Sequence, residues 1–256
     1  MALLEAENIS IEFGGLKAVQ DFNLHLNEQE LYAIIGPNGA GKTTAFNMLT
    51  GIYTPTSGIV RMDGEVMNGK KAYQFTRKGI ARTFQNIRLF NNLSVEDNVK
   101  IGLHNQERYS AITGVLRLPW YWSREKAAHE RALELLSLFG MADLADHQAG
   151  SLPYGAQRRL EIVRALATNP SLLLLDEPAA GMNPSETAEL MENIVKIRDT
   201  FQIAVMLIEH DMKLVMSICE GICVLNFGQV IAKGTAEEIQ SNPAVIEAYL
   251  GKQKEA

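Results

Sequence analysis

Hydrophobic and polar residues alternate through the first thirty positions, in two runs that are separated by Gly14-Gly15. Successive side chains of a strand point to opposite faces, so the two runs predict a β-hairpin, with a third antiparallel strand beside it. Residues 31–35 are continuously apolar, which is typical of a strand that is covered on both faces. The chain is therefore predicted to begin with an antiparallel β subdomain and one buried strand.

Buried strands and helical patterns alternate through much of the remaining chain. Apolar runs at 172–175 and 203–208 predict two more buried strands, and a helical pattern follows each of them. Asn183 and Pro184 mark one helix start, because Asn caps helices and Pro suits the first turn. Further helices are predicted at 212–218 and from Thr235, with two or three strand-like segments between them. This order indicates an α/β fold with a mainly parallel sheet.

Residues 87–166 have a predominantly helical pattern instead. Ser94 and Asp97 predict one helix start, and residues 124–139 have helical spacing up to Gly140. Residues 102–123 between them are irregular and hold both tryptophans, which we interpret as an insertion or a small surface subdomain. We expect one domain, with a core of residues 1–86 and 167–256 and an inserted helical subdomain at 87–166.

The composition, 46% hydrophobic and 21% charged with a net charge of −6, is that of a globular protein and argues against a general nucleic-acid binder. No apolar run approaches the roughly 18 residues that cross a bilayer, and the N-terminus lacks the basic start of a signal peptide. Cys219 and Cys223 have neither a zinc spacing nor a disulfide pattern. We expect a soluble, cytoplasmic protein with both thiols packed in its core.

The strongest chemical signal is a G-x-x-x-x-G-K-[ST] motif that directly follows the first buried strand. Its glycines let successive N–H groups point at a phosphate chain, and the next helix adds its positive end. Lys42 would contact the β- and γ-phosphates, and the Thr43 hydroxyl would bind Mg²⁺. A purely structural glycine turn does not explain the strand before it and the helix after it. The predicted phosphate-binding residues are Gly36, Pro37, Asn38, Gly39, Ala40, Gly41, Lys42, Thr43 and Thr44.

Two carboxylates, Asp176 and Glu177, follow the apolar run at 172–175. The carboxyl end of a parallel strand is where α/β folds place their sites. We expect Asp176 to bind Mg²⁺ and Glu177 to act as the general base on an attacking water. Alone, the pair could simply cap the helix after Pro178. Together with the phosphate motif, it indicates nucleotide hydrolysis.

Gln85 and His210 become informative through their order in the chain. A glutamine before a helical segment usually lies in solvent, and a lone histidine at a strand end is more often structural. Here they fall in the order Lys42, Gln85, Asp176, His210. With this order, the sequence resembles the ATP-binding cassette subunits of ABC transporters over essentially its whole length.

The resemblance implies a P-loop NTPase (RecA-like) fold, with ATP and Mg²⁺ as ligands. It implies that Gln85 contacts Mg²⁺ and the attacking water, and that His210 contacts the γ-phosphate. An aromatic residue near the N-terminus stacks on adenine in this family. Phe13 is the best match, with Val19 beside the ring, although Phe13 could equally pack in the core.

Two segments depart from the family pattern. The signature Leu-Ser-Gly-Gly-Gln is represented here by residues 152–156, which read LPYGA, and Asn183 replaces the aspartate of the D-loop. In the family the signature binds the γ-phosphate held by a partner cassette. Gly155 and the following helix keep that capacity, whereas Pro153 removes an N–H and a hydroxyl.

The same segments resemble one subgroup, the first of two cassette subunits of bacterial branched-chain amino acid importers. The matching stretches are FGGLKAV, RTFQNIRLF, LPYGAQRRLEI, DEPAAGMNP, IEHDMKLVM and AYLG. The alternatives are a cassette of a lipid or polysaccharide exporter and a soluble ABC ATPase of translation or DNA repair. A P-loop kinase or GTPase would not account for Gln85 and His210.

The resemblance also implies the protein's partners and location. We expect transmembrane permease subunits, a second cassette, identical or homologous, and, indirectly, an extracytoplasmic solute-binding protein. Nucleic acid is not expected as a partner. The predicted location is the cytoplasmic face of the inner membrane, to which the protein would attach peripherally.

Overall fold

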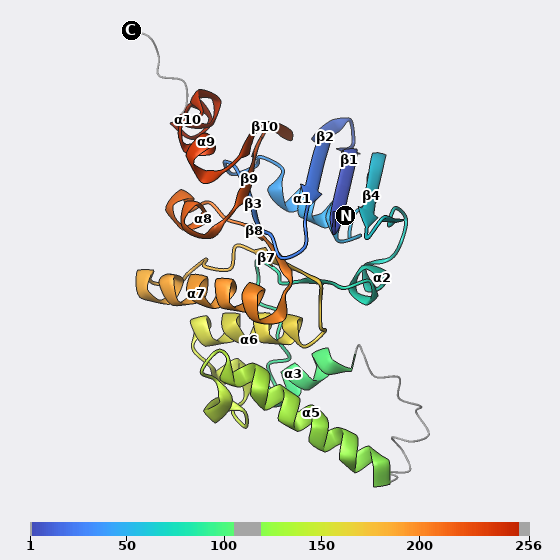
Figure 1. The fold of residues 1–256 in the computed structure, drawn as a ribbon, viewed down its shortest axis with the longest axis vertical. Helices are drawn as coiled ribbons and strands as arrows, with labels where there is room; N and C mark the ends of the chain where they lie inside the picture. The colour runs from blue at the N-terminus through green and yellow to red at the C-terminus, as the bar shows by residue number, and fades with distance from the viewer. Residues whose placement is uncertain (1, 105–118, 251–256) are drawn as a thin grey trace.

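The computed structural model describes residues 2–104 and 119–250, in two sheets and a set of packed helices (Figure 1). One sheet is antiparallel, in the order β2-β1-β4-β5, and the other has the order β10-β9-β3-β8-β7-β6. The strands are β1 (Leu4–Phe13), β2 (Leu16–Leu26), β3 (Leu31–Ile35), β4 (Ser57–Met62), β5 (Glu65–Val66), β6 (Ile80–Arg82), β7 (Leu172–Asp176), β8 (Ala204–Ile208), β9 (Gly221–Asn226) and β10 (Gln229–Gly234).

The helices cover the second sheet and extend below it in the view of Figure 1. They are α1 (Lys42–Leu49), α2 (Ala72–Arg77), α3 (Val95–Leu103), α5 (Pro119–Ser137), α6 (Tyr154–Leu166), α7 (Pro184–Phe201), α8 (Met212–Ile218), α9 (Ala236–Gln240) and α10 (Pro243–Leu250), with 3₁₀ turns at Ala142–Leu144 and Ala149–Ser151. None of these described helices is long and apolar enough to span a membrane.

The predicted hairpin is confirmed. β1 and β2 pair antiparallel from Leu4↔Leu26 to Phe13↔Leu16, and Gly14 and Gly15 make the turn. The third antiparallel strand is β4, which pairs with the other edge of β1. Since β4 follows α1 in the chain, the third strand joins the antiparallel sheet only after β3 and α1.

The mainly parallel sheet is also confirmed, with β3, β6, β7, β8 and β9 parallel and β10 antiparallel at the edge. Alternate residues of the buried strand β3 enter different cores. Ile34 packs with Phe22 and Phe46 between the two sheets, whereas Ile35 packs on the side of α6 and α7. Because the parallel strands end at one edge, the segments after β3, β7 and β8 meet there.

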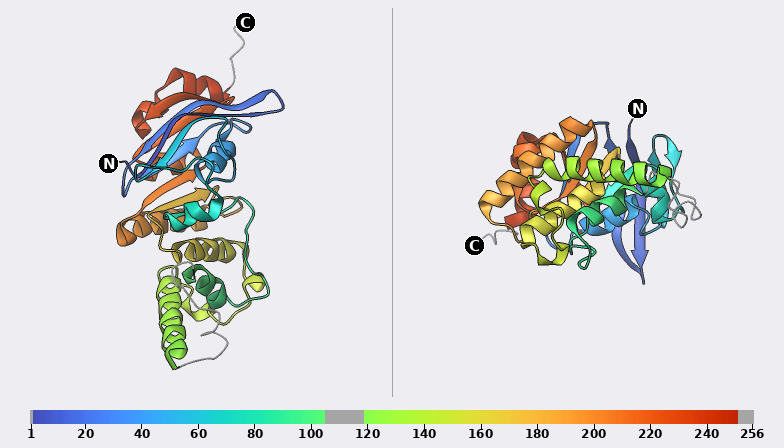
Figure 2. Two further views of the ribbon diagram at one scale, coloured as in Figure 1. Left: turned by 90° about the vertical axis from the view of Figure 1, so that its right-hand side faces the viewer. Right: turned by 90° about the horizontal axis from the view of Figure 1, so that it is seen from below.

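The helices α3, α5 and α6 form the lower part of the molecule (Figure 1 and Figure 2). Their apolar side chains belong to the same cluster as β7 and β8, with Val99 and Leu136 joined to Leu173 and Leu207. The Ser94 cap is as predicted, since its hydroxyl accepts a hydrogen bond from the Asp97 N–H. The lower part is thus continuous with the core beneath the sheet.

The prediction of irregular structure at 102–123 is wrong for those of its residues that the structure describes. Gly102 and Leu103 complete α3, and α5 begins at Pro119 rather than Arg124. Proline is well suited to a first helical turn, because it lacks the N–H that would have no partner there. Trp122 lies on this helix with 58% of its surface exposed. Residues 105–118 of the expected insertion lie outside the described residues.

Both cysteines are buried free thiols, as predicted. Burial raises the pKa of the Cys219 and Cys223 thiols to about 12 each. Such thiols stay protonated at neutral pH and act as small apolar side chains.

Asn183 caps α7 as predicted: its Oδ1 accepts hydrogen bonds from the N–H groups of Ser185 and Glu186, both at 3.0 Å. We predict that Asn183→Ala lowers the free energy of unfolding by about 1 kcal/mol, the usual value of such a cap. Asn183→Asp retains the acceptor and is expected to unfold at the wild-type urea midpoint. An equal loss in both variants would show that the cap does not stabilise α7.

Candidate active site

The predicted phosphate-binding loop joins β3 to α1 in a tight curl. Gly36 has φ 152°, and a Cβ there would overlap the carbonyl oxygen of Leu225. Gly41 has φ 99°, and a Cβ there would lie 2.9 Å from the carbonyl oxygen of Ala18. A side chain fits at neither position, so the curl requires glycine at both ends of the loop.

The loop surrounds a buried ammonium group. Lys42 is 6% exposed, and its Nζ donates hydrogen bonds to the carbonyls of Gly36 (2.7 Å) and Pro37 (3.0 Å). Burial lowers the pKa of Lys42, while the nearby carboxylates of Glu177 and Asp176 act in the opposite direction. Helix α1 begins here, with its N-terminal amides toward the loop. The Lys42 ammonium and this helix N-terminus both favour the binding of an anion.

A cleft of about 500 Å³ lies over this loop. It brings the loop together with Gln85 and Glu177, which come from distant parts of the chain. Its lining residues are Leu16, Lys17, Ala18, Asn38, Gly39, Ala40, Gly41, Lys42, Thr43, Thr44, Gln85, Glu177, Phe227 and Gly228.

The Glu177 side chain lies between the two other predicted catalytic residues. Gln85 Nε2 donates a 2.9 Å hydrogen bond to Glu177 Oε2, and His210 Nδ1 lies 3.5 Å from Oε1. The backbone at Glu177 has φ 49°, in the left-handed region that non-glycine residues rarely adopt. Its N–H donates to the carbonyl of Ile208. A strained backbone therefore lies where the side chains of Gln85, Glu177 and His210 meet, and such strain is frequent at active sites.

Asp176 is buried, and one of its oxygens is already paired. Arg82 Nη2 donates a 2.7 Å hydrogen bond to Asp176 Oδ2, and the same guanidinium donates to Asn47 and Thr50. Oδ1 is buried without a hydrogen-bond partner among the described residues. A buried carboxylate oxygen without a partner is costly, and a divalent cation would satisfy it.

Two predicted base-binding residues do not line this cleft. Phe13 packs edge-on against Tyr53, with ring centroids 5.3 Å apart, and Val19 is fully buried behind Gly41. The large apolar side chains that do line it are Leu16 and Phe227, which are 71% and 84% exposed. Base stacking by Phe13 stays a prediction.

Gly155 lies in the first turn of α6, away from this cleft. A Cβ on Gly155 would be 3.2 Å from Glu186 Oε1, so the neighbouring element is α7 and not the phosphate loop. A role of Gly155 in phosphate binding therefore requires a phosphate that is held by another chain.

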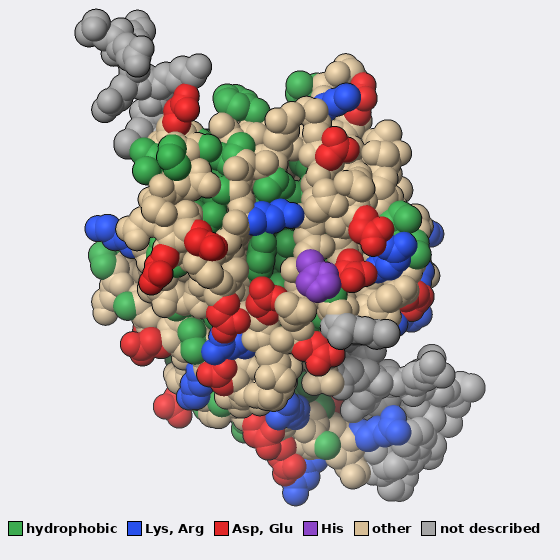
Figure 3. Space-filling model, turned by 45° about the horizontal axis from the view of Figure 1, so that its top comes forward, with side chains coloured by type: hydrophobic (Ala, Val, Ile, Leu, Met, Phe, Trp, Pro, Cys, Tyr) green, Lys and Arg blue, Asp and Glu red, His purple; other side chains and the backbone are tan. Residues whose placement is uncertain are grey.

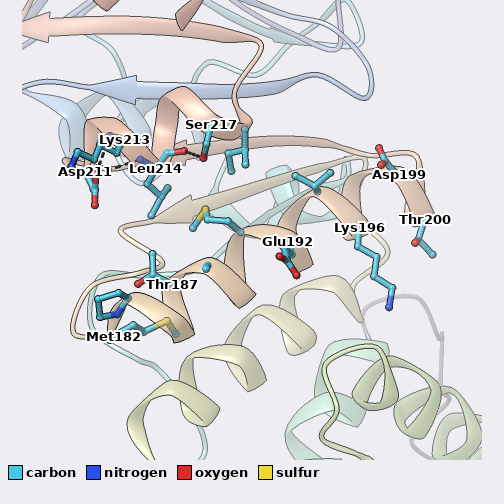
Figure 4. A pocket seen from close by; sticks show the side chains of 15 residues that line it. Met182, Thr187, Glu192, Lys196, Asp199, Thr200, Asp211, Lys213, Leu214 and Ser217 are labelled. Carbon is cyan, nitrogen blue, oxygen red and sulfur yellow. Dashed lines mark hydrogen bonds between the residues drawn. The ribbon is translucent and has the colours of Figure 1, made fainter.

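Two other surface features do not belong to the site. A hollow of about 940 Å³ lies between α7 and α8 (Figure 4) and contains none of the predicted site residues. On the face shown in Figure 3, acidic and basic side chains are interspersed, as is usual for a solvated surface. The smaller cleft, in contrast, is lined by Lys42, Gln85 and Glu177.

A mainly parallel sheet, a glycine loop between strand and helix, and an acid pair after a neighbouring strand define a P-loop nucleotide-binding protein. The comparisons with known proteins agree. The family model described as "ABC transporter" matches residues 19–180, and that of the "Branched-chain amino acid ATP-binding cassette transporter" matches residues 229–255.

Two curated relatives match almost end to end. The chain is 47% identical to the high-affinity branched-chain amino acid transport ATP-binding protein BraF of Pseudomonas aeruginosa, and 46% identical to LivG of Escherichia coli. Each match covers 97% of this chain and 98% of the relative.

Among solved structures, the ADP conformation of MJ1267, an ATP-binding cassette of an ABC transporter, superposes with a TM-score of 0.85 at 30% identity. That match covers 98% of this chain and 100% of the other. A dimeric post-hydrolysis state of the cassette MJ0796, bound to ADP and Pi, has a TM-score of 0.77 at 26% identity, covering 91% and 98%. The chain belongs to the ABC transporter family, as one of its ATP-hydrolysing cassettes.

Arg82 was not predicted from the sequence, and the structure gives it a testable role. We predict that Arg82→Met lowers the free energy of unfolding by about 3–5 kcal/mol, because it leaves the buried Asp176 carboxylate without its counter-charge. Adding Asp176→Asn should restore part of this loss. Chemical denaturation measures both.

Arg61→Met is the matched control, since Arg61 pairs with Glu7 at 2.7 Å on the surface, with side chains 26% and 54% exposed. Its expected cost is at most about 1 kcal/mol. Equal costs at the two arginines would refute the importance of the buried pair.

Proposed function

We propose that this cassette is the motor subunit of an importer for branched-chain amino acids. The names of the relatives and the match at residues 229–255 support the solute class and favour it over lipid or polysaccharide export. The observation that supports the motor role most directly is the convergence of Gln85 and His210 on Glu177 beside the phosphate loop.

Each residue of this group has a specific task in hydrolysis. Glu177 accepts the proton of the attacking water as general base, and Gln85 holds the carboxylate that does so. Lys42 and the α1 N-terminus offset the negative charge of the β- and γ-phosphates. His210, whose Nδ1 lies 3.5 Å from the Glu177 carboxylate, would contact the γ-phosphate.

Magnesium fits the donor groups on this side of the cleft. Thr43, Asp176 and Gln85 would hold it, with Asp176 offering its unpartnered buried oxygen. One carboxylate with neutral oxygens is the donor set typical of Mg²⁺ that is shared with phosphates. The ion would supply charge to the phosphate oxygens. Among the described residues, no three His, Cys, Asp or Glu side chains are grouped so that they could hold a metal ion by themselves.

A second cassette would complete the site. Gly155 lies outside the cleft of its own chain, and the N-terminus of α6 carries no side-chain cap, which leaves amides for an anion. The dimeric MJ0796 structure supports pairing of two cassettes. The phosphate that Gly155 contacts would then belong to the partner cassette.

A groove of about 440 Å³ between α3, α6 and the segment after β6 is the proposed docking site for the permease. Phe90 lines it, and because 48% of its surface is exposed, its ring is available to a partner rather than packed in the core. The Arg164 guanidinium lies 5.7 Å from the ring, and burial lowers the pKa of Arg164. A short cytoplasmic helix with an apolar face would fit these walls. This docking would place the cassette peripherally on the cytoplasmic face of the membrane, with the solute-binding protein on the other side.

Glu177→Gln tests the motor role. It should bind ATP with near wild-type affinity and lower kcat by at least about 100-fold, as loss of a general base does. Lys42→Ala should instead weaken ATP binding. Nucleotide affinity and phosphate release, measured on the full chain in its assembled transporter, separate the two effects.

Glu189→Gln is the control, because Glu189 lies on the surface of α7 in a partly exposed pair with Arg159. It should hydrolyse ATP at the wild-type rate. Full turnover by Glu177→Gln would exclude Glu177 as the base.

Phe90→Ala tests the docking site. We expect folding and ATP affinity to be nearly unchanged while uptake into proteoliposomes is lost, because the ring contacts the partner rather than the core. A buried phenylalanine would instead cost about 3–5 kcal/mol of stability. Melting temperature and uptake are measured on the same variant.

Tyr73→Ala is the comparison for this experiment, since Tyr73 is 54% exposed on α2 and does not line the groove. It should retain uptake. A large melting shift in Phe90→Ala, with uptake lost in proportion to folded protein, would contradict the docking role.

A further inference from the structure

Arg158 is a completely buried arginine in the second turn of α6, directly after the degenerate signature segment at 152–156. It is the largest of the fully buried side chains of the described residues. A buried guanidinium is stable only when most of its donors are satisfied. The partners of Arg158 therefore show what the position is built to hold.

The guanidinium holds the backbones of two separate catalytic segments. Its Nη2 donates to the carbonyls of Gln85 (3.1 Å), Asp176 (3.3 Å) and Glu177 (2.9 Å). Its Nη1 donates to the carbonyl of Phe84. One side chain thus joins the segment after β6 to the segment after β7.

The same nitrogen, Nη2, contacts the carbonyls of both Gln85 and Glu177, whose side chains hydrogen-bond each other at 2.9 Å. Gln85 and Glu177 are therefore fixed twice, through their side chains in the cleft and through their main chains behind it. Glu177 also has the left-handed backbone at φ 49° that turns its carboxylate toward the cleft. A hydrogen bond to its carbonyl helps to maintain that unfavourable conformation.

We propose that Arg158 is a positioning residue for ATP hydrolysis, which sets the geometry of the Gln85–Glu177 pair from behind the site and ties it to the signature helix α6. The inference rests on the roles proposed above for Gln85 and Glu177. Arg158 touches neither the nucleotide cleft nor the surface, so it acts through these two residues.

The charge of Arg158 is balanced by one residue of the same helix. Nη1 lies 2.9 Å from Glu161 Oε2, and Glu161 is 1% exposed. Glu161 Oε1 accepts a 3.2 Å hydrogen bond from the backbone N–H of Arg88. Both Glu161 and Arg88 line the proposed permease groove, so the floor of that groove is two hydrogen bonds away from the catalytic pair.

Arginine chemistry predicts that this position is sensitive even to a conservative substitution. A planar guanidinium directs five N–H donors in a fixed fork, which suits several carbonyls at once. A lysine ammonium has the same charge and three donors on a flexible chain, and it cannot reproduce the fork. Arg158→Lys therefore retains the charge and removes the geometry.

The experiment compares Arg158→Lys with Arg159→Lys in the assembled transporter. Arg159 is the next residue of α6 and forms a partly exposed pair with Glu189 at 3.1 Å. The same substitution at Arg159 therefore leaves the buried hydrogen bonds of Arg158 intact. We expect Arg158→Lys to lower kcat by about 10- to 100-fold, the effect of a small misplacement of reacting groups, with KM for ATP changed less than about threefold. Arg159→Lys should match the wild type in both.

A double-mutant cycle with Gln85→Ala tests the route of the effect. If Arg158 acts through the Gln85–Glu177 pair, Arg158→Lys should lower kcat much less in the Gln85→Ala background than in the wild type. Additive effects would overturn the proposal. It would also be overturned by a wild-type kcat in Arg158→Lys, or by a loss that is explained by the folded fraction or by KM.

Should Arg158→Lys not fold, Glu161→Gln replaces it, because this variant keeps the volume and removes the counter-charge of the fork. It should lower kcat with KM unchanged, and full turnover would overturn the proposal. Glu177→Gln, assayed in parallel, separates the positioning role of Arg158 from the general-base role of Glu177. If Glu177→Gln abolishes hydrolysis while Arg158→Lys is normal, only the positioning role fails; if Glu177→Gln is fully active, the assignment of the base fails.

Discussion

The burial of negative charge at the carboxyl end of β7 is the constraint on which the rest of the site depends. Asp176 is buried and the Glu177 side chain is 13% exposed, and a carboxylate that is withdrawn from solvent needs partners close by. Arg82 neutralises Asp176, while Gln85 and His210 surround the Glu177 carboxylate. The compensation comes from β6 and from the segments after β6 and β8, so forming the sheet also forms the catalytic group.

Much of the fold could be predicted because its determinants are local. The β1–β2 hairpin, the buried strands and the Asn183 cap depend on residues that are close in sequence, and all were predicted and are present. The helical start of α5 was missed because Pro119 and the aromatic residues after it show no apolar periodicity. The helix there follows from the residues that come later in α5.

The chemistry of the site could be predicted in part. Lys42, Asp176 and Glu177 belong to recognisable motifs, and the structure places Gln85 and His210 beside Glu177. Arg82 and Arg158 could not be found, because an arginine in a strand or an amphipathic helix looks like a surface residue. Their burial and partners exist only in the folded chain, across 94 and 19 positions of sequence respectively.

The contact between the phosphate loop and the β9–β10 turn has a consequence for how the protein is made. The phosphate loop near the N-terminus packs on the turn between β9 and β10: the N–H of Gly228 donates to the carbonyl of Ala40, and Gly36 lies against Leu225. A chain emerging from the ribosome carries the loop long before it carries that turn. The nascent protein therefore passes through synthesis without a finished nucleotide site, and ATP can act as a ligand that stabilises the fold only once β9 and β10 are in place.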